Sequence, residues 1–473
     1  MGSELLPVYQ FGHLAMHLVT KIGWNATCLT SIDTTHLKLP FTHLNYKVDQ
    51  SQPQPKIFYN PGSFEGIMAH LLPVYLGMKS VPNVRPDLVV GHMSYGTMLY
   101  LRNLYDCPFV GYFELLPPPF WSPEMVLRRE YPPPEGVRLF NANYHALTYL
   151  HMHMIDAGYT PTNYQLTTIP PEMRYKFRVI HDGIDTEFFK REPVNRPTTF
   201  EVTGSFSRPS GDPEKRRTSV TIGPETRVVT YVSRGLESIR GFDIFMKAAG
   251  RIAKERSDTI FLIAGDERSN YGHELHYLGG KTFKQHVLSQ GDYDPNRFHF
   301  LGLIPTTDLI RLYHLSDLHI YLTVPFVLSW SMLQAMASEC VIIASKTPPV
   351  EEAMNDDVTG LLVDFYDADS LAEKALKVLK DPTEYRRLGA GARAKVMERF
   401  ALEPCLAQLV EYFQNVYAKA HGGAAPPPAA PAKPEPIALE KSVGAPYGEI
   451  RGPEAGSPIQ QKNDPSEGDR RRP

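Results

Sequence analysis

The chain has 473 residues, of which 42% are apolar and 21% charged, and its formal net charge is −3. This length suits two domains of roughly 200 residues each plus extra segments, and the composition is typical of a globular enzyme. The charge balance argues against nucleic acid as the main partner, because binding to phosphate backbones requires a concentrated basic surface.

The cysteines and the apolar runs favour a cytosolic chain. Cys28, Cys107, Cys340 and Cys405 are scattered without metal-ligand spacing, which is typical of reduced thiols. No run approaches the roughly 18–20 apolar residues that a membrane-spanning helix requires, and the start lacks a signal-peptide pattern. We expect a cytoplasmic protein without a metal or other cofactor, and leave open a peripheral association with the inner face of the membrane.

The N-terminal region, residues 1–192, predicts an α/β domain rich in proline and aromatic residues. Predicted strands lie at 26–30, 87–90, 108–112 and 179–181, and predicted helices at 14–22 and 98–104. Only a few residues precede the segment 11–14 that leads into the first helix, so we expect the first strand of this domain to be missing, through a truncated start or a departure from the usual fold.

Residues 193–225 are polar and turn-rich, which predicts an interdomain linker. Residues 226–420 alternate short apolar strands with amphipathic helices, the pattern of a parallel sheet covered on both faces. Predicted strands lie at 227–232, 259–264, 299–302, 318–322, 341–344 and 361–363, and predicted helices at 242–255, 307–314, 330–338, 370–379, 382–399 and 402–417. The fold class expected is α/β with two Rossmann-like domains.

The last segment, residues 421–473, holds eleven of the 42 prolines and almost no apolar clusters. A segment of this composition cannot bury enough surface to fold alone, so we expect a disordered tail.

Short motifs follow the strands of the C-terminal region. Ser233 and Arg234 come directly after the first strand, and the pair Arg240-Gly241 follows after five intervening residues. Further motifs lie at 159–165, 179–186, 263–266, 300–303, 325–337 and 344–351. Their order and spacing resemble glycosyltransferase family 4, in a bacterial branch, from about residue 11 to residue 417.

The resemblance implies a GT-B fold, with the two domains facing across a cleft and the helix at 402–417 crossing back onto the first domain. It also implies a retaining, metal-independent transfer of a sugar from a UDP- or GDP-linked donor. The expected acceptor is a hydroxyl of a glycan or lipid-linked glycan, in cell-envelope or extracellular glycan synthesis.

The predicted catalytic groups on the donor side are Arg234 and Arg240, because negative charge grows on the departing diphosphate and two fixed cations offset it. Backbone N–H groups at Leu328 and Ser329, just before a helix, are expected to face the same diphosphate. The remaining predicted donor contacts are Ser233, Gly302, Leu303, Gln334 at the ribose and Glu351 near the sugar.

On the acceptor side, His92 and Glu114 each follow a predicted strand, where open α/β sheets gather their ligands. A packed loop histidine is an equally good interpretation of His92. For Asp182 and Gly183 a structural turn is favoured over a site role, and residues 266–270 are expected to form a surface loop.

Several positions depart from the family pattern. The family carries two glutamates with seven residues between them, and these positions are Phe326 and Gln334 here. The usual lysine is Arg240, and Glu114 stands where many relatives carry a histidine. The rival hypothesis is therefore a non-catalytic GT-B protein that binds a nucleotide-sugar or a partner enzyme. Another GT-B enzyme, such as a phosphorylase or an epimerase, is a third alternative.

Overall fold

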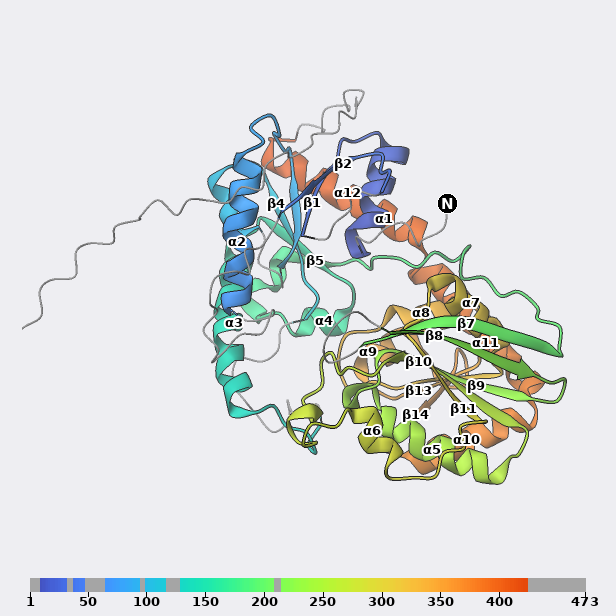
Figure 1. Cartoon of the computed structure of the whole chain (residues 1–473). Helices are drawn as coiled ribbons and strands as arrows, with labels where there is room; N and C mark the ends of the chain where they lie inside the picture. Colours follow the sequence, from blue (N-terminus) through green and yellow to red (C-terminus); the bar gives the residue numbers. More distant parts are fainter. Residues whose placement is uncertain are drawn as a thin grey trace, which may run out of the picture. The chain divides into compact units, whose positions relative to one another are not determined.

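The structure is a computed structural model that describes residues 9–31, 37–46, 64–93, 98–115, 128–207 and 214–423. Nearly all of the segment predicted to be a disordered tail lies outside these residues. The described residues form two α/β regions, each built on a parallel sheet (Figure 1).

The C-terminal region contains a six-stranded parallel sheet in the order β11-β10-β9-β12-β13-β14. The strands are β9 (Arg227–Gly235), β10 (Thr259–Asp266), β11 (Phe298–Gly302), β12 (Leu318–Tyr321), β13 (Ile342–Ser345) and β14 (Leu361–Val363). The helical segments between and after them are η7 (Ser238–Arg240), α5 (Phe242–Glu255), η8 (Glu274–His276), α6 (Phe283–Leu288), α7 (Thr306–Leu315), α8 (Trp330–Ala337), α9 (Pro348–Ala353), α10 (Ala368–Lys380) and α11 (Pro382–Arg399).

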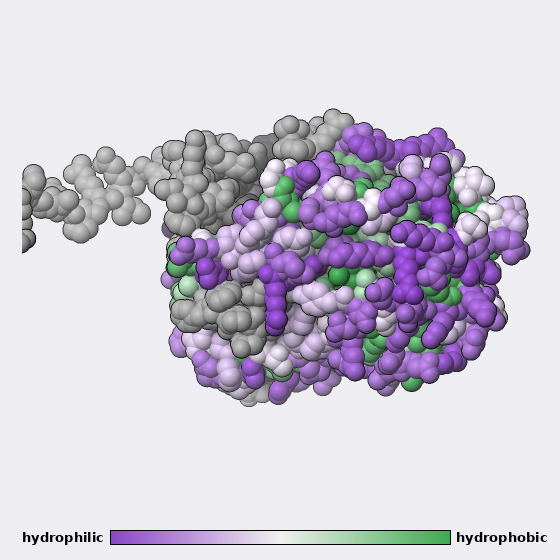
Figure 2. Space-filling view, turned by 90° about the horizontal axis from the view of Figure 1, so that it is seen from below, coloured by the Kyte–Doolittle hydropathy of each residue, from purple (hydrophilic) through white to green (hydrophobic). Residues whose placement is uncertain are grey.

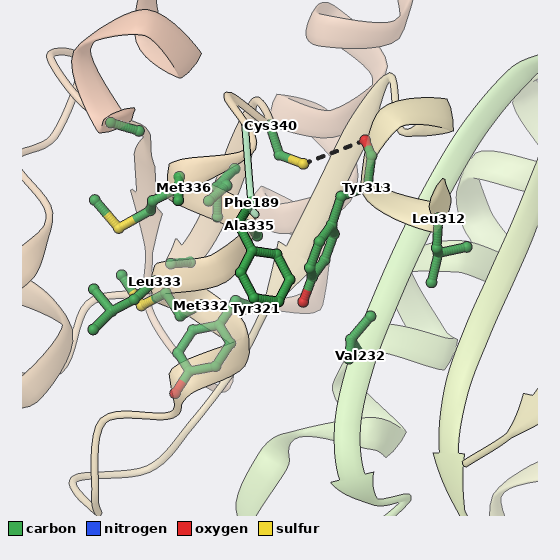
Figure 3. Close-up of a cluster of buried hydrophobic side chains, with 14 of the residues drawn as sticks. Phe189, Val232, Leu312, Tyr313, Tyr321, Met332, Leu333, Ala335, Met336 and Cys340 are labelled. Carbon is green, nitrogen blue, oxygen red and sulfur yellow. Dashed lines mark hydrogen bonds between the residues drawn. The ribbon is translucent and has the colours of Figure 1, made fainter. Parts of the chain in front are cut away.

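Both faces of this sheet are buried, which explains its continuous apolar strands. Val229 of β9 packs with α5, α6 and α10, whereas its neighbour Val228 packs on the opposite face with α7, α8, α9 and α11. In the second cluster α8 contributes Met332, Leu333 and Met336 (Figure 3). The Cys340 thiol lies in the same cluster, 3.6 Å from the carbonyl oxygen of Tyr313.

The N-terminal region contains a four-stranded parallel sheet in the order β3-β4-β5-β6 and a separate parallel pair, β1-β2. The strands are β1 (Thr27–Thr30), β2 (Thr42–Asn45), β3 (Val89–His92), β4 (Phe109–Tyr112), β5 (Ala157–Thr160) and β6 (Phe177–Val179). The helical segments are α1 (Tyr9–His17), η2 (Leu18–Ile22), α2 (Phe64–Lys79), η4 (Leu99–Asn103), α3 (Glu135–Met154), α4 (Asn163–Thr167) and η6 (Pro171–Lys176).

The last helix, α12 (Leu402–Ala420), returns to the N-terminal sheet. Its residues Leu406, Leu409 and Phe413 pack in one cluster with residues of β4, β5 and α1. The chain therefore passes between the two regions twice. The two passages are bonded to each other, because Ile184 N–H donates to Phe400 O at 2.7 Å and Leu402 N–H donates to Ile184 O at 2.9 Å.

The segment expected to be a linker contains regular structure. The strands β7 (Thr198–Phe206) and β8 (Glu214–Ile222) pair antiparallel over nine residues each. Every second side chain of β7 is buried, beginning with Phe200 and Val202, while Glu201 and Thr203 are exposed. This period-2 alternation makes the segment an amphipathic hairpin. The domain boundaries themselves remain a prediction.

On the face shown in Figure 2, hydrophilic side chains predominate and hydrophobic ones form small scattered spots, as is usual for a surface in contact with water. Among the described helices, none is both long and apolar enough to cross a bilayer.

Candidate functional site

Arg240 ends the short turn η7, which follows β9, and Gly241, with φ of +64°, is the N-cap residue of α5. The Arg240 side chain is buried. Its Nη1 donates to Thr323 Oγ1 at 2.9 Å, Tyr321 Oη at 3.3 Å and the Val327 carbonyl oxygen at 3.3 Å. The guanidinium is thus held beside the carboxyl end of β12, the edge at which open parallel sheets bind ligands.

Two buried carboxylates, those of Glu237 and Glu274, form hydrogen bonds that hold the η7 turn and the segment 270–272 together. Glu237 Oε2 accepts hydrogen bonds from the backbone N–H groups of Asn270, Tyr271 and Gly272, and Glu274 Oε2 accepts one from Ser238 Oγ at 2.6 Å. Burial raises the pKa of the Glu237 carboxyl, although these backbone donors act in the opposite direction. Its Oε1 is among the described buried atoms without a hydrogen-bond partner.

Arg234 and Arg240 are connected through a pair of aromatic rings. Arg234 is exposed and donates to Tyr271 Oη at 3.1 Å. The Tyr271 ring lies 5.2 Å from the ring of Phe326, and the Arg240 guanidinium lies 5.2 Å from the centre of that same ring. The two predicted catalytic arginines therefore border one aromatic surface, at a distance typical of cation–π contacts.

The predicted helix start is formed by α8, with Ser329 at its N-cap. The Ser329 N–H donates to Tyr321 Oη at 3.1 Å, so this amide already has a protein partner. Leu328 is buried in the core beside α8. Gln334 is half-buried and lies one turn beyond Trp330, so the two side chains share a face of the helix.

Gly302 and Leu303, predicted to contact the nucleotide, meet the β7–β8 hairpin. The N–H and C=O of Leu303 both bond to the backbone of Ser205, at 2.9 and 2.8 Å. A Cβ at Gly302, whose φ is +69°, would lie 2.8 Å from Ser205 O, so this glycine allows the close approach of the hairpin. Ser233, the remaining predicted contact, donates from its hydroxyl to the Gly235 carbonyl oxygen.

Glu351 is exposed in the first turn of α9, and its neighbour Glu352 makes the specific contacts. Glu352 Oε1 accepts from the Asn163 N–H at 2.8 Å and from its Nδ2 at 2.6 Å, and Oε2 accepts from the Tyr164 N–H at 3.1 Å. Tyr164 Oη also donates to Pro325 O at 2.7 Å. Glu352 therefore holds α4 against the C-terminal region, at the end of that helix where a negative charge is favourable.

The two acceptor-side candidates are close together. His92 ends β3 and Glu114 follows β4, and His92 Nε2 lies 3.5 Å from Glu114 Oε2. His92 is buried, whereas Glu114 is about one-third exposed, so the carboxylate is the more accessible of the pair.

Asp182, for which the sequence favoured a structural turn, is linked to this pair through Tyr112, whose ring lies 5.0 Å from the His92 ring. The carboxyl is buried and accepts hydrogen bonds from Tyr112 Oη at 3.1 Å and from the indole N–H of Trp330, the first residue of α8. Burial raises the pKa of Asp182 to about 7, with a smaller contribution from the nearby Glu114. Asp182 thus connects the acceptor-side pair to the helix that carries Gln334.

Within the described ranges, no cluster of three or more His, Cys, Asp or Glu residues has the arrangement of a metal site. The structure also brings to this site residues that the sequence did not assign to it: Glu237, Glu274, Tyr271, Asp182 and Arg128. No local pattern identifies them, because their partners lie far along the chain; only the position of Glu237, three residues before Arg240, was a signal.

Comparison with known proteins finds two family models, one after the other along the chain. Residues 23–189 match the model described as glycosyl transferase family 4 group, and residues 212–395 match the model described as glycosyl transferases group 1.

Among curated proteins, the D-inositol 3-phosphate glycosyltransferase of Mycobacterium marinum is 26% identical over 242 residues, which cover 50% of this chain and 43% of that protein. The N-acetyl-alpha-D-glucosaminyl L-malate synthase of Bacillus anthracis is 28% identical over 122 residues, covering 26% of this chain and 30% of that protein. The matches thus span less than half the length of these relatives.

Among solved structures, the sucrose-phosphate synthase of Thermosynechococcus elongatus has a TM-score of 0.61 at 17% identity, covering 86% of this chain and 92% of that one. The Anabaena HepE protein in complex with UDP and glucose has a TM-score of 0.57 at 15% identity, covering 87% and 96%. These similarities confirm the GT-B architecture with two Rossmann-like domains.

Proposed function

Because this chain belongs to the family-4 glycosyltransferases, we propose that it transfers a sugar from a nucleoside-diphosphate donor to a hydroxyl group of an acceptor, with retention of configuration. The observation that carries the proposal is the pair Arg234 and Arg240, bordering one aromatic surface after the central strand of the C-terminal sheet. The Anabaena protein of the same fold, whose complex contains UDP and glucose, supports a nucleotide-sugar donor.

The two arginines have a defined task in this reaction. As the bond between sugar and diphosphate breaks, negative charge accumulates on the phosphate oxygens. Fixed cations stabilise that charge more in the transition state than in the bound donor. Arg240 is held by three acceptors, whereas Arg234 is exposed and donates to Tyr271 Oη, so it is accessible to an incoming ligand. The proposal assigns charge compensation to these side chains rather than to a metal ion.

The pair His92 and Glu114 is proposed to position the acceptor hydroxyl. The proton of the acceptor hydroxyl passes to the departing phosphate oxygen. The bond between the acceptor oxygen and the sugar forms on the face from which the phosphate leaves, so no covalent sugar–enzyme intermediate is expected. Gln334 is proposed to hydrogen-bond the ribose, and Ser233, Leu328, Ser329, Gly302, Leu303 and Glu351 to line the donor site. A glycosyl-enzyme adduct detected by mass spectrometry would contradict this mechanism.

The names of the curated relatives include inositol phosphate and malate, both of which offer a hydroxyl group. They support a hydroxyl acceptor for this chain without restricting it to a sugar. A glycan or lipid-linked glycan acceptor, the choice between UDP and GDP donors, and a peripheral contact with a membrane remain predictions.

The test is release of nucleoside diphosphate from a panel of UDP- and GDP-linked sugars. Slow hydrolysis of the donor makes an acceptor unnecessary. Arg234→Ala is expected to lower the rate by about 100-fold or more, as for the loss of one preorganised donor to a developing charge. Arg386→Ala, an exposed arginine of α11, is the matched control and should leave the rate unchanged.

The rival function is a non-catalytic protein that binds nucleotide-sugars, and the replacement of both family glutamates by Phe326 and Gln334 favours it. Binding of a nucleotide-sugar without release, in the wild-type chain, would support the rival. If the wild-type chain shows no binding and no release with any donor of the panel, the donor site itself is refuted.

A further inference from the structure

Arg128 belongs to the N-terminal region, and besides its near neighbour Glu130 it bonds to Ser238 and Asp243 of the C-terminal region. Its side chain is only 2% exposed, which is unusual for an arginine and requires that its donors be satisfied within the protein. The next residue, Arg129, is exposed. Adjacent arginines of the same chemistry therefore lie in opposite environments.

The guanidinium of Arg128 makes a two-point contact with the carboxylate of Asp243. Its Nη1 lies 3.1 Å from Asp243 Oδ1, and its Nη2 lies 2.8 Å from Oδ2. Nη1 also donates to the Ser238 carbonyl oxygen at 2.5 Å. The planar guanidinium of an arginine can make these hydrogen bonds to Asp243 and Ser238 at the same time, whereas the ammonium group of a lysine can make only some of them.

Aromatic rings enclose the same guanidinium. The rings of Tyr131, Phe365 and Tyr366 have their centres 5.7, 5.5 and 5.6 Å from its central carbon. Tyr277 Oη donates to Pro132 O at 2.7 Å and so fixes the chain just after Arg128. The segment 128–132 is thus held at several points.

The two partners of Arg128 in the C-terminal region lie at the two ends of the turn that carries Arg240. Ser238 is the first residue of η7, and its carbonyl oxygen also accepts from the Gly241 N–H at 2.9 Å, the bond that closes the turn. Asp243 lies in the first turn of α5, immediately after it. Arg128 therefore joins the beginning of the turn to the helix that follows.

We propose that Arg128 is a positioning residue of the donor site, which acts through Arg240 by holding the η7 turn in the geometry that meets the diphosphate. This rests on the proposed function, in which Arg240 contacts that group. Because Arg128 comes from the N-terminal region, the phosphate-binding turn is complete only when that region is docked on it. Displacement of a charged group by about 1 Å can cost roughly 100-fold in rate, so the coupling has kinetic consequences.

The experiment is a double-mutant cycle of Arg128→Lys with Arg240→Ala, read as nucleoside-diphosphate release and as affinity for the free nucleoside diphosphate. Arg128→Lys alone is expected to lower the rate by about 10- to 100-fold, while Arg129→Lys, the matched control, stays near wild type. In the Arg240→Ala background, Arg128→Lys should change the rate by less than about threefold. Effects that multiply fully would overturn the proposal, because they would mean that Arg128 acts independently of Arg240.

A second measurement does not depend on activity. Backbone hydrogen exchange of residues 240–242, whose N–H groups bond within the turn, should accelerate by about tenfold or more in Arg128→Lys and in Asp243→Asn, but not in Arg129→Lys. Unchanged exchange would overturn the proposal. If the wild-type chain neither binds nor releases a nucleoside diphosphate, the proposed function fails, and the exchange result still decides whether Arg128 holds the turn.

Discussion

Replacing the buried carboxyl of Asp182 by an amide should change how the stability of the protein depends on pH. Asp182→Asn keeps an acceptor for the Tyr112 hydroxyl and removes the ability to ionise. In the wild-type protein, burial raises the pKa of Asp182 from 3.8 to about 7. The folded state therefore holds this proton more tightly than the unfolded state does between about pH 4 and pH 7.

The direction and the size of the change in unfolding free energy with pH follow from this shift in pKa. Since the folded pKa is raised, the carboxyl costs no stability at low pH and an increasing amount as the pH rises towards 7. A shift of about three units corresponds to roughly 4 kcal/mol in full, and about 2.5 kcal/mol of this falls between pH 5 and pH 8. The wild type should lose that stability relative to Asp182→Asn over this range, and the difference should level off above pH 8.

Two buried histidines require that the wild type and the variant be compared directly. Burial lowers the pKa of His181 to about 4 and that of His319 to about 3, so both groups make the protein more stable as the pH rises to about 6.5. Their contribution is present in both proteins and cancels in the difference.

The assay is urea unfolding of both proteins at pH 5, 6, 7 and 8, with the free energy of unfolding compared at each pH. Asp357→Asn, at an aspartate that is 69% exposed, controls for the loss of one negative charge. A difference between wild type and Asp182→Asn that stays constant within about 0.5 kcal/mol over this range would refute the reasoning.

Two further predictions concern the fold and the thiols. Gly204→Ala should lower the free energy of unfolding by more than about 2 kcal/mol, because the new Cβ would lie 1.6 Å from the Leu301 carbonyl oxygen. Gly77→Ala, at a helical glycine with open space around it, should raise it by about 0.5–1 kcal/mol; equal urea midpoints for the two variants would contradict this. Burial raises the pKa of Cys28, Cys340 and Cys405 to about 12 and that of Cys107 to about 11, so iodoacetamide at pH 8 should label the four thiols only in denaturant. Rapid labelling of the native protein, followed by mass spectrometry, would show that the thiols are accessible and ionised.

The C-terminal sheet could be predicted from the sequence because its strands are buried on both faces. Val228 and Val229 pack in different clusters, so the strand appears as a continuous apolar run without knowledge of its neighbours. Long helices of the N-terminal region were harder to identify. In α3 the buried positions include His151 and Thr148, and polar residues at such positions hide the helical period.

The β7–β8 hairpin was missed for a different reason. Its charged and turn-forming residues suggested a linker, while the alternation from Phe200 to Phe206 was the signal that identifies a strand with one buried face. For residues 266–270 a surface loop was expected. Residues 267–270 form such a loop, with Arg268 and Asn270 exposed, whereas Asp266 ends β10, is buried and accepts hydrogen bonds from Ser207. The hairpin was therefore missed because composition was judged without the packing partner.

At the candidate site, the sequence indicated the residues that follow strands, since chain order fixes which edge of a parallel sheet they reach. It could not indicate Arg128 or Asp182. Asp243, a partner of Arg128 in the C-terminal region, is 115 positions away, and the partner of Asp182 on β4 is 70 positions away. Contacts of this kind depend on how the strands and helices pack, which no local pattern encodes.

The paired passages at Ile184 and Ala401 have a mechanical consequence. The two chain segments that join the regions are hydrogen-bonded to each other at this place, so we expect them to act as one connection rather than as two independent ones. If one passage were cut, the other would still keep the two regions at a high effective concentration for each other. Cleavage of the chain at either passage should therefore leave the two regions associated, because the uncut passage still joins them covalently.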